Sequence, residues 1–141
     1  GLRRTSAWRR SVLGVPFVHE LRIRYGECDM QGVVFNANYL AYVDDAIDRW
    51  FATLLHSSGS GDGFDCMVKR ATVEWSSPAT RGDVLSLTPS VVRWGRTSFD
   101  VAVDGRVGER PVFAAVLVYV SVTPGGIEPC PVPDEVRAAL G

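Results

Sequence analysis

The sequence predicts an α+β fold in which a five-stranded antiparallel sheet wraps around one long helix. Three observations lead to this fold class: an alternating apolar stretch near the start, apolar residues at helical spacing, and four later runs rich in β-branched and aromatic residues. A chain of 141 residues is large enough for one domain with a substantial core. We therefore expect a single domain over residues 17–141, preceded by an arginine-rich, flexible arm over residues 1–16.

The first strand and the helix are each predicted by their periodicity. Residues 17–25, FVHELRIRY, place apolar and charged side chains on opposite faces, which is typical of a half-buried strand. From Leu40 to Leu54 the apolar residues recur every three or four positions, which predicts a helix that ends near His56. Asn38 is suited to cap this helix, because its short side chain can accept a hydrogen bond from a first-turn amide.

The remaining strands are predicted by composition and by turn residues. They span residues 66–75, 84–92, 98–103 and 112–122. The last run is almost wholly apolar, which indicates a strand inside the sheet. The stretches 94–96 (WGR) and 104–105 (DG) predict turns between neighbouring strands, and residues 133–140 predict a short final helix that begins with a proline.

Composition excludes several classes of function. A formal net charge of −1 offers no large basic field for nucleic acid, and no apolar run is long enough to cross a membrane. The three cysteines have neither zinc-site nor redox-motif spacing, so we expect reduced thiols in a cytoplasmic protein. No phosphate-binding glycine loop or serine-hydrolase elbow occurs, and with two histidines we expect neither a metal site nor a cofactor.

The stretch 26–40, GECDMQGVVFNANYL, places acids directly before the helix. Gly32 permits a sharp turn, so Asp29 can face the free amides at the start of the helix. A carboxylate opposite such donors suits acyl transfer, because the donors stabilise the oxygen on which negative charge develops. An acid at this place is also a common helix cap or dipole partner, and the spacing alone leaves both interpretations open.

Three segments together carry a family resemblance. Residues 24–40 (RYGECDMQGVVFNANYL), 77–83 (SPATRGD) and 93–99 (RWGRTSF) resemble the motifs of hotdog-fold acyl-CoA thioesterases of the 4-hydroxybenzoyl-CoA type. The resemblance covers about residues 17–123. It implies a sheet wrapped around one long helix, and two subunits that join their sheets with active sites at the dimer interface, alone or as a dimer of dimers.

The resemblance also implies roles for individual residues. Asp29 matches the catalytic carboxylate, which acts as nucleophile or general base, and the backbone N–H of Asn36 matches the group that polarises the thioester carbonyl. Gly32 matches the glycine of the turn between them. Tyr39 and Asp44 match helix positions near the substrate.

Arg96 matches a basic position that meets CoA phosphate, although the hairpin around it has fewer basic residues than is usual in the family. The expected function is hydrolysis of an acyl-CoA, with no metal or cofactor and with a second copy of the chain as partner. Alternatives are an acyl-carrier-protein thioesterase, a non-hydrolytic acyl-thioester binding protein, or a dehydratase on the same fold. Cys28 is a rival nucleophile, but no histidine stands beside it in the sequence.

Overall fold

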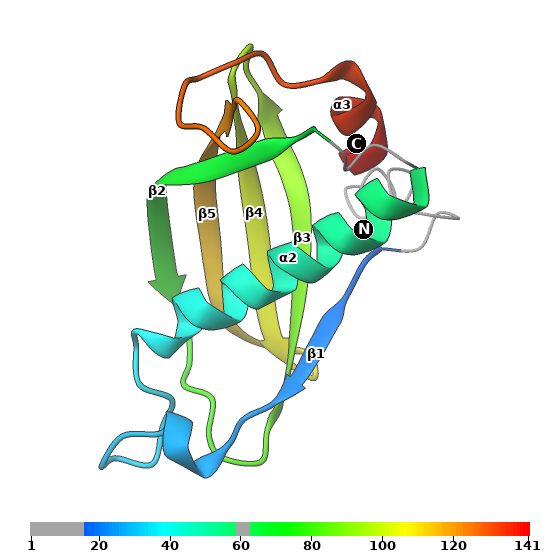
Figure 1. Cartoon of the computed structure of the whole chain (residues 1–141). Helices are drawn as coiled ribbons and strands as arrows, with labels where there is room; N and C mark the ends of the chain where they lie inside the picture. The colour runs from blue at the N-terminus through cyan, green and yellow to red at the C-terminus, as the bar shows by residue number, and fades with distance from the viewer. Residues whose placement is uncertain (1–15, 59–62) are drawn as a thin grey trace.

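The computed structural model describes residues 16–58 and 63–141, so the expected arm lies, except for Pro16, outside the described residues (Figure 1). Five strands form one antiparallel sheet in the order β1-β3-β4-β5-β2, and α2 lies across one face of it (Figure 1). This is the predicted hotdog fold. The elements are β1 (His19–Arg22), the 3₁₀ turn η2 (Tyr25–Glu27), α2 (Asn38–Ser58), β2 (Asp65–Trp75), β3 (Val84–Trp94), β4 (Ser98–Val107), β5 (Arg110–Val122) and α3 (Asp134–Leu140).

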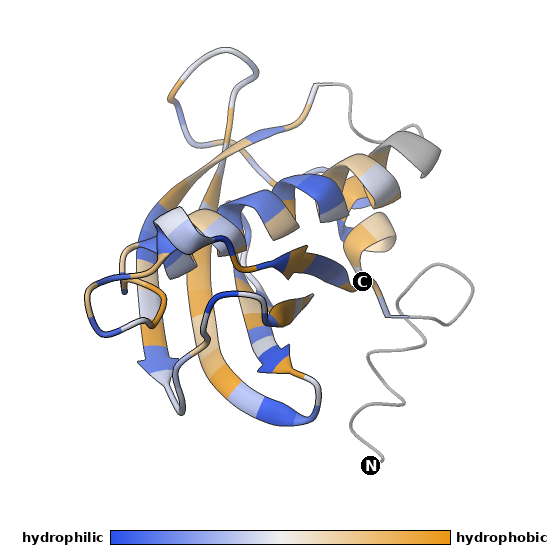
Figure 2. Cartoon of the chain, turned by 90° about the horizontal axis from the view of Figure 1, so that it is seen from below, coloured by the Kyte–Doolittle hydropathy of each residue, from blue (hydrophilic) through white to orange (hydrophobic). Residues whose placement is uncertain are grey.

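The core forms between α2 and the inner face of the sheet. Alternate residues of β3 and β4 are buried, as a period of two requires for a sheet with one covered face. Runs of apolar residues colour the strands orange in Figure 2, whereas hydrophilic residues recur along α2. The buried side chains of α2 that are larger than alanine are Tyr39, Tyr42, Val43, Ile47, Trp50, Leu54 and Leu55. No helix in the described part of the chain is long and apolar enough to cross a membrane.

The strands β3, β4 and β5 extend beyond their predicted ends, and β1 is shorter than predicted. The prediction of a turn at Asp104 and Gly105 is wrong, because both residues lie within β4 and the chain reverses between Val107 and Arg110. Gly105 is needed for a different reason. A Cβ at this position would meet the ring of Phe113 on the neighbouring strand, so glycine leaves room for that ring against the backbone of β4.

The strand β2 forms one edge of the sheet, so one side of its backbone pairs with β5 and the other side has no strand of residues 16–58 or 63–141 beside it. A register shift between Val68 and Arg70 marks a bulge in its pairing with β5. The strand also exposes large apolar side chains, with Met67 50% and Trp75 48% accessible. An open edge with exposed apolar residues favours pairing with another chain.

We predict that Gly105→Ala destabilises the protein, because the new methyl group must displace the Phe113 ring in a packed core. The expected loss is about 1–3 kcal/mol of unfolding free energy, seen as a fall of roughly 3–10 °C in the melting temperature. Adding Phe113→Leu should restore part of the lost unfolding free energy, because leucine leaves more room for the new methyl group. Gly26→Ala is the control, because a Cβ there meets no atom within 4 Å. An unchanged melting temperature for Gly105→Ala would contradict the explanation that Gly105 leaves room for the Phe113 ring.

Candidate active site

A short hairpin carries Asp29 toward the start of α2. The Asp29 N–H donates to the Val33 carbonyl oxygen at 2.8 Å, and the Phe35 N–H donates to the Glu27 carbonyl oxygen at 3.0 Å. The turn closes where the Gly32 N–H donates to the Asp29 carbonyl oxygen at 3.0 Å. Gly32 has a φ of 79°, a conformation that side-chain-bearing residues seldom adopt. Gly32 therefore has the turn-forming role that the sequence predicts.

The Asp29 side chain is exposed and held at one oxygen. Its Oδ1 accepts a hydrogen bond from the Gln31 N–H at 2.8 Å, which fixes the direction of the carboxylate. Its Oδ2 has no donor among the residues that the structure describes. One carboxylate oxygen is thus oriented by the hairpin, and the other is open to a substrate or a water molecule.

The start of α2 supplies free backbone donors. In the described residues, the N–H groups of Asn36 and Ala37 donate to no protein acceptor, whereas the Asn38 N–H donates to the Phe35 carbonyl oxygen at 2.9 Å. The prediction that the Asn38 side chain caps the helix by accepting a hydrogen bond from a first-turn amide is wrong. Its Nδ2 donates to the Glu27 carbonyl oxygen at 2.8 Å and so ties the helix to the hairpin. The amides before the helix therefore remain free to bind an anion.

Asp29 lines a cleft of about 920 Å³, and so do Phe35 and Asn38, the residues on either side of the two free amides. Asp29 and Gly32 lie on one part of its wall, Phe35 and Asn38 on another, and Tyr25 and Arg81 also line it. The segment of residues 77–83, which carries Arg81, is held beside the hairpin by the Val34 N–H, which donates to the Ala79 carbonyl oxygen at 2.9 Å. The sequence predicts no role for Tyr25 or Arg81, since only folding brings residues 77–83 beside the hairpin.

Glu27 has a structural role. Its carboxylate accepts from the Arg24 N–H at 2.8 Å and from the Arg24 guanidinium at 3.0 Å. Burial alone would raise the pKa of Glu27, but the hydrogen bonds from Arg24 outweigh it, so the pKa lies below its ordinary value. Burial, and then the neighbouring Glu27 carboxylate, raise the pKa of the Tyr42 phenol. Glu27 is thus an ionised anchor beside the cleft.

The other residues suggested by the resemblance lie at different distances from this cleft. Tyr39 is 2% exposed, and its hydroxyl oxygen accepts a hydrogen bond from the Ala79 N–H at 3.2 Å, so it packs beneath the site. Asp44 is on the exposed side of α2 and does not line the cleft. Arg96 lies in the turn between β3 and β4, at the opposite end of the sheet from the hairpin of Asp29 (Figure 1).

Cys28 also lines the cleft, but no histidine side chain that the structure describes hydrogen-bonds to its thiol. Its thiol donates weakly to the Arg24 carbonyl oxygen at 3.8 Å. His19 instead bonds through Nε2 to the Asp45 carboxylate at 2.9 Å, so it offers no base to that thiol. In the described part of the chain, no group of three or more His, Cys, Asp or Glu residues is arranged to hold a metal ion.

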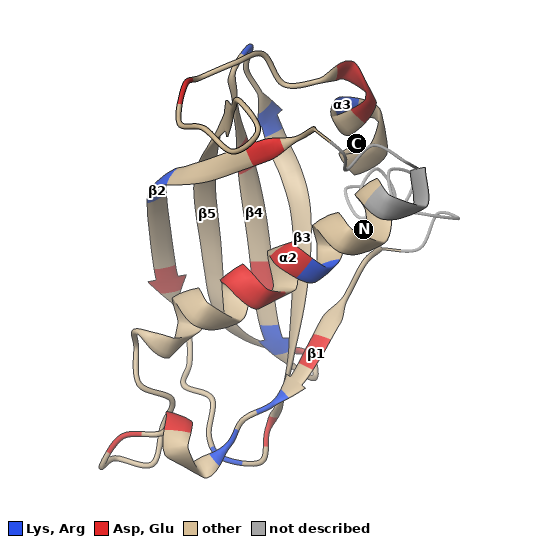
Figure 3. Cartoon of the chain, in the orientation of Figure 1, with Lys and Arg blue, Asp and Glu red and all other residues tan. Residues whose placement is uncertain are grey.

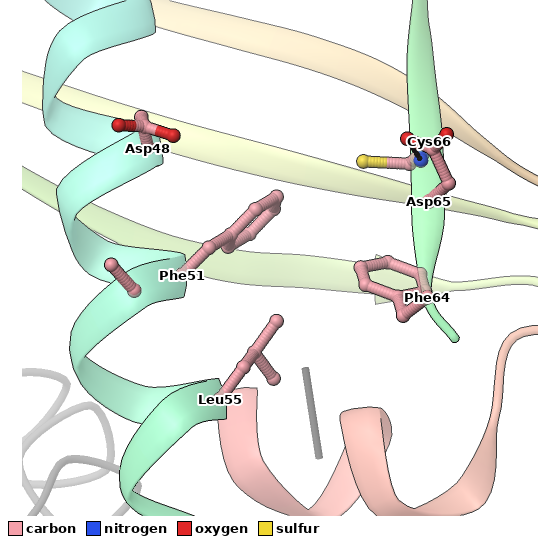
Figure 4. A pocket seen from close by; sticks show the side chains of 7 residues that line it. Asp48, Phe51, Leu55, Phe64, Asp65 and Cys66 are labelled. Atoms are coloured by element: carbon pink, nitrogen blue, oxygen red, sulfur yellow. Dashed lines mark hydrogen bonds between the residues drawn. The ribbon is translucent and has the colours of Figure 1, made fainter. Parts of the chain in front are cut away.

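A second cavity of about 200 Å³ lies between the later turns of α2 and the start of β2 (Figure 4). Burial raises the pKa of its Cys66 thiol to about 12, which keeps that thiol neutral near pH 7. The cavity has carboxylates but no helix start, so it lacks the paired groups of the Asp29 cleft. Its walls are formed by Asp48, Phe51, Ala52, Leu55, Phe64, Asp65 and Cys66.

Comparison with solved structures shows the same fold in known proteins. A thioesterase superfamily protein from Jannaschia sp. CCS1 has a TM-score of 0.80 at 22% identity, covering 89% of this chain and 90% of its own. The 1,4-dihydroxy-2-naphthoyl-CoA thioesterase from Synechocystis has a TM-score of 0.74 at 19% identity, covering 88% and 94%. A gentisyl-coenzyme A thioesterase has a TM-score of 0.73 at 22% identity, covering 88% and 98%.

No curated protein sequence matches the chain. The model of one protein family, described as the Thioesterase-like superfamily, matches residues 23–140. The matched region includes the hairpin of Asp29, the whole of α2 and all strands but β1. The chain therefore belongs to the Thioesterase-like superfamily and is a thioester hydrolase.

Proposed function

We propose that the protein hydrolyses acyl-CoA thioesters in the cleft beside Asp29. The observation that carries the proposal is the pairing of an oriented carboxylate with free amides. Asp29 has one oxygen held by Gln31 and one oxygen open, and the N–H groups of Asn36 and Ala37 are free at the start of α2. Both groups belong to segments that line the same cleft.

In this mechanism the thioester carbonyl oxygen accepts from the Asn36 N–H. Negative charge develops on that oxygen as the carbonyl carbon is attacked, and the amide together with the α2 dipole stabilises it. Asp29 either attacks the carbon directly, which expels the thiolate and leaves a mixed anhydride that water then hydrolyses, or removes a proton from the attacking water. Each route consumes one water molecule and releases one acid and one thiol. The thiol departs as thiolate, because its pKa of about 8.5 needs no strong acid.

The supporting residues position the reacting groups and the substrate but do not react themselves. Gly32 allows the turn that directs Asp29, and Tyr39 packs under the start of α2 and holds Ala79. Asp44, on the exposed side of α2 and outside this cleft, would meet only an acyl group that extends from the cleft along the helix. Arg96 is too far along the sheet to serve Asp29 of its own chain, so its proposed contact with CoA requires a second copy.

A homodimer would supply that second copy through β2. This strand is an open edge and exposes Met67, Val68 and Trp75. Antiparallel pairing of two equivalent strands turns the partner end over end, so the partner's turn between β3 and β4 comes to the end of the sheet that carries Asp29. We propose this pairing as the basis of the active assembly.

We favour acyl-CoA over a carrier-protein thioester as the substrate, because two proteins of similar structure are thioesterases of 1,4-dihydroxy-2-naphthoyl-CoA and gentisyl-CoA. Aromatic acyl-CoAs are therefore the first substrates to test. A cytoplasmic location is part of the proposal, since Cys28, Cys66 and Cys130 are all free thiols.

We predict that Asp29→Asn lowers kcat/KM for an aromatic acyl-CoA by at least about 100-fold, because the amide can neither attack nor accept a proton. The measurement is thiol release, with circular dichroism to verify the fold. The control is Asp134→Asn, which changes an exposed acid in the first turn of α3, away from the cleft. Turnover of Asp29→Asn within about threefold of the wild type would overturn the assignment.

We also predict that a variant without the Asp29 carboxylate and a variant without the proposed Arg96 contact complement each other. In a mixed dimer of Asp29→Asn and Arg96→Gln chains, one site combines an intact Asp29 with the partner's intact Arg96. Mixing the refolded variants should therefore give more activity than the mean of the two alone. Activity that stays at the mean, while mass measurement shows mixed dimers, would place Arg96 outside the partner's site.

A further inference from the structure

A stacked arginine and tyrosine stand at the rim of the Asp29 cleft. The guanidinium carbon of Arg81 lies 5.8 Å from the centroid of the Tyr25 ring. Tyr25 is 77% exposed, and both residues line the cleft. Arg81 forms no ion pair and no hydrogen bond with any other described residue. A guanidinium placed over an aromatic face keeps its edge donors free, so Arg81 offers a fork of N–H groups to a ligand.

A tight turn sets the backbone position of Arg81. The Asp83 N–H donates to the Thr80 carbonyl oxygen at 3.1 Å, and Gly82 has a φ of 89°. Two hydrogen bonds then fasten this turn to the residue after β1: Gly82 donates to the Ile23 carbonyl oxygen at 2.9 Å, and Ile23 donates to the Asp83 carbonyl oxygen at 2.9 Å. The base of the Arg81 side chain is therefore held firmly beside the cleft.

Two acids on the segments around Arg81, Asp83 and Glu27, are bound by other basic residues and do not neutralise it. The Asp83 Oδ2 accepts from the Thr80 N–H at 2.9 Å and lies 3.6 Å from the Arg110 Nη2. Glu27 is bound by Arg24. Basic residues lie on both segments at this end of the molecule, the one that follows β1 and the one between β2 and β3 (Figure 3). The rim of the cleft is consequently a place where an anionic group gains attraction without displacing an ion pair of Arg81.

We propose that Arg81, stacked on Tyr25, binds the phosphate at the end of the substrate's pantetheine arm. This subsite rests on the proposed function, because the thioester at Asp29 sets where the arm begins. The phosphate is common to CoA and to a carrier protein, and the guanidinium fork matches its oxygens. The exposed face of Tyr25 that Arg81 leaves uncovered packs against the arm. Arg81 then favours thiol carriers that bear this phosphate, while Asp29 and the amides carry out the chemistry.

The kinetic test uses one acyl group on three thiols: benzoyl-CoA, benzoyl-4′-phosphopantetheine and benzoyl-pantetheine, of which the last has no phosphate. Arg81→Gln should raise KM about tenfold for the two phosphorylated substrates and leave kcat unchanged. KM for benzoyl-pantetheine should stay within about twofold. Arg81→Lys should recover part of the loss, because lysine keeps the charge but not the fork. Arg49→Gln, at an exposed arginine of α2 outside the cleft, is the matched control.

A binding measurement keeps the test independent of turnover. Calorimetric titration with CoA, 4′-phosphopantetheine and pantetheine should show the same pattern of Kd changes in Arg81→Gln. Equal changes for all three ligands, or no change for any, would overturn the subsite. A change for CoA alone would also overturn it, since Arg81 would then contact the nucleotide phosphates. Failure of the proposed function looks different: the wild type would bind the phosphorylated ligands and hydrolyse none of the thioesters.

Discussion

The carbonyl oxygen of Glu27 is the point on which the site depends. It accepts one hydrogen bond from the Phe35 N–H and a second from the Asn38 side chain, at 3.0 Å and 2.8 Å. The first bond closes the hairpin that carries Asp29, and the second joins this hairpin to the first residue of α2. Because both bonds end on one atom, the carboxylate and the helix start are held as one unit. Catalysis by positioned groups requires that kind of rigidity.

The hydrophobic core between α2 and the sheet supports this unit. Tyr39 lies in the core under the start of α2, where its ring packs against Trp75 and Phe113. Phe113 in turn lies against Gly105 of β4, the position with no room for a side chain. The absence of a side chain at Gly105 therefore leaves space for the ring that supports the helix start. Packing energy in the core and geometry at the surface are linked through these few residues.

Much of this arrangement is predictable from the sequence, because periodicity reports which face of each element is buried. The order of one strand, one helix and four strands follows from it, and so does the turn at Gly32. Two local predictions are wrong for identifiable reasons. Asp104 and Gly105 have the composition of a turn, but glycine serves close packing there. Asn38 stands at the helix start but donates from its amide instead of accepting with its oxygen. Arg81 and Tyr25 are far apart in sequence, so only the fold shows their contact.

The most direct test of the central claim is a crystal structure with an aromatic acyl-CoA analogue in which a CH₂ group replaces the thioester sulfur, leaving an unreactive ketone. The account predicts that the ketone oxygen lies about 3 Å from the Asn36 N–H, with the carbonyl carbon about 3–3.5 Å from an Asp29 oxygen or from a water held by it. An analogue whose carbonyl lies away from both groups, for example in the cavity between α2 and β2, would contradict the account.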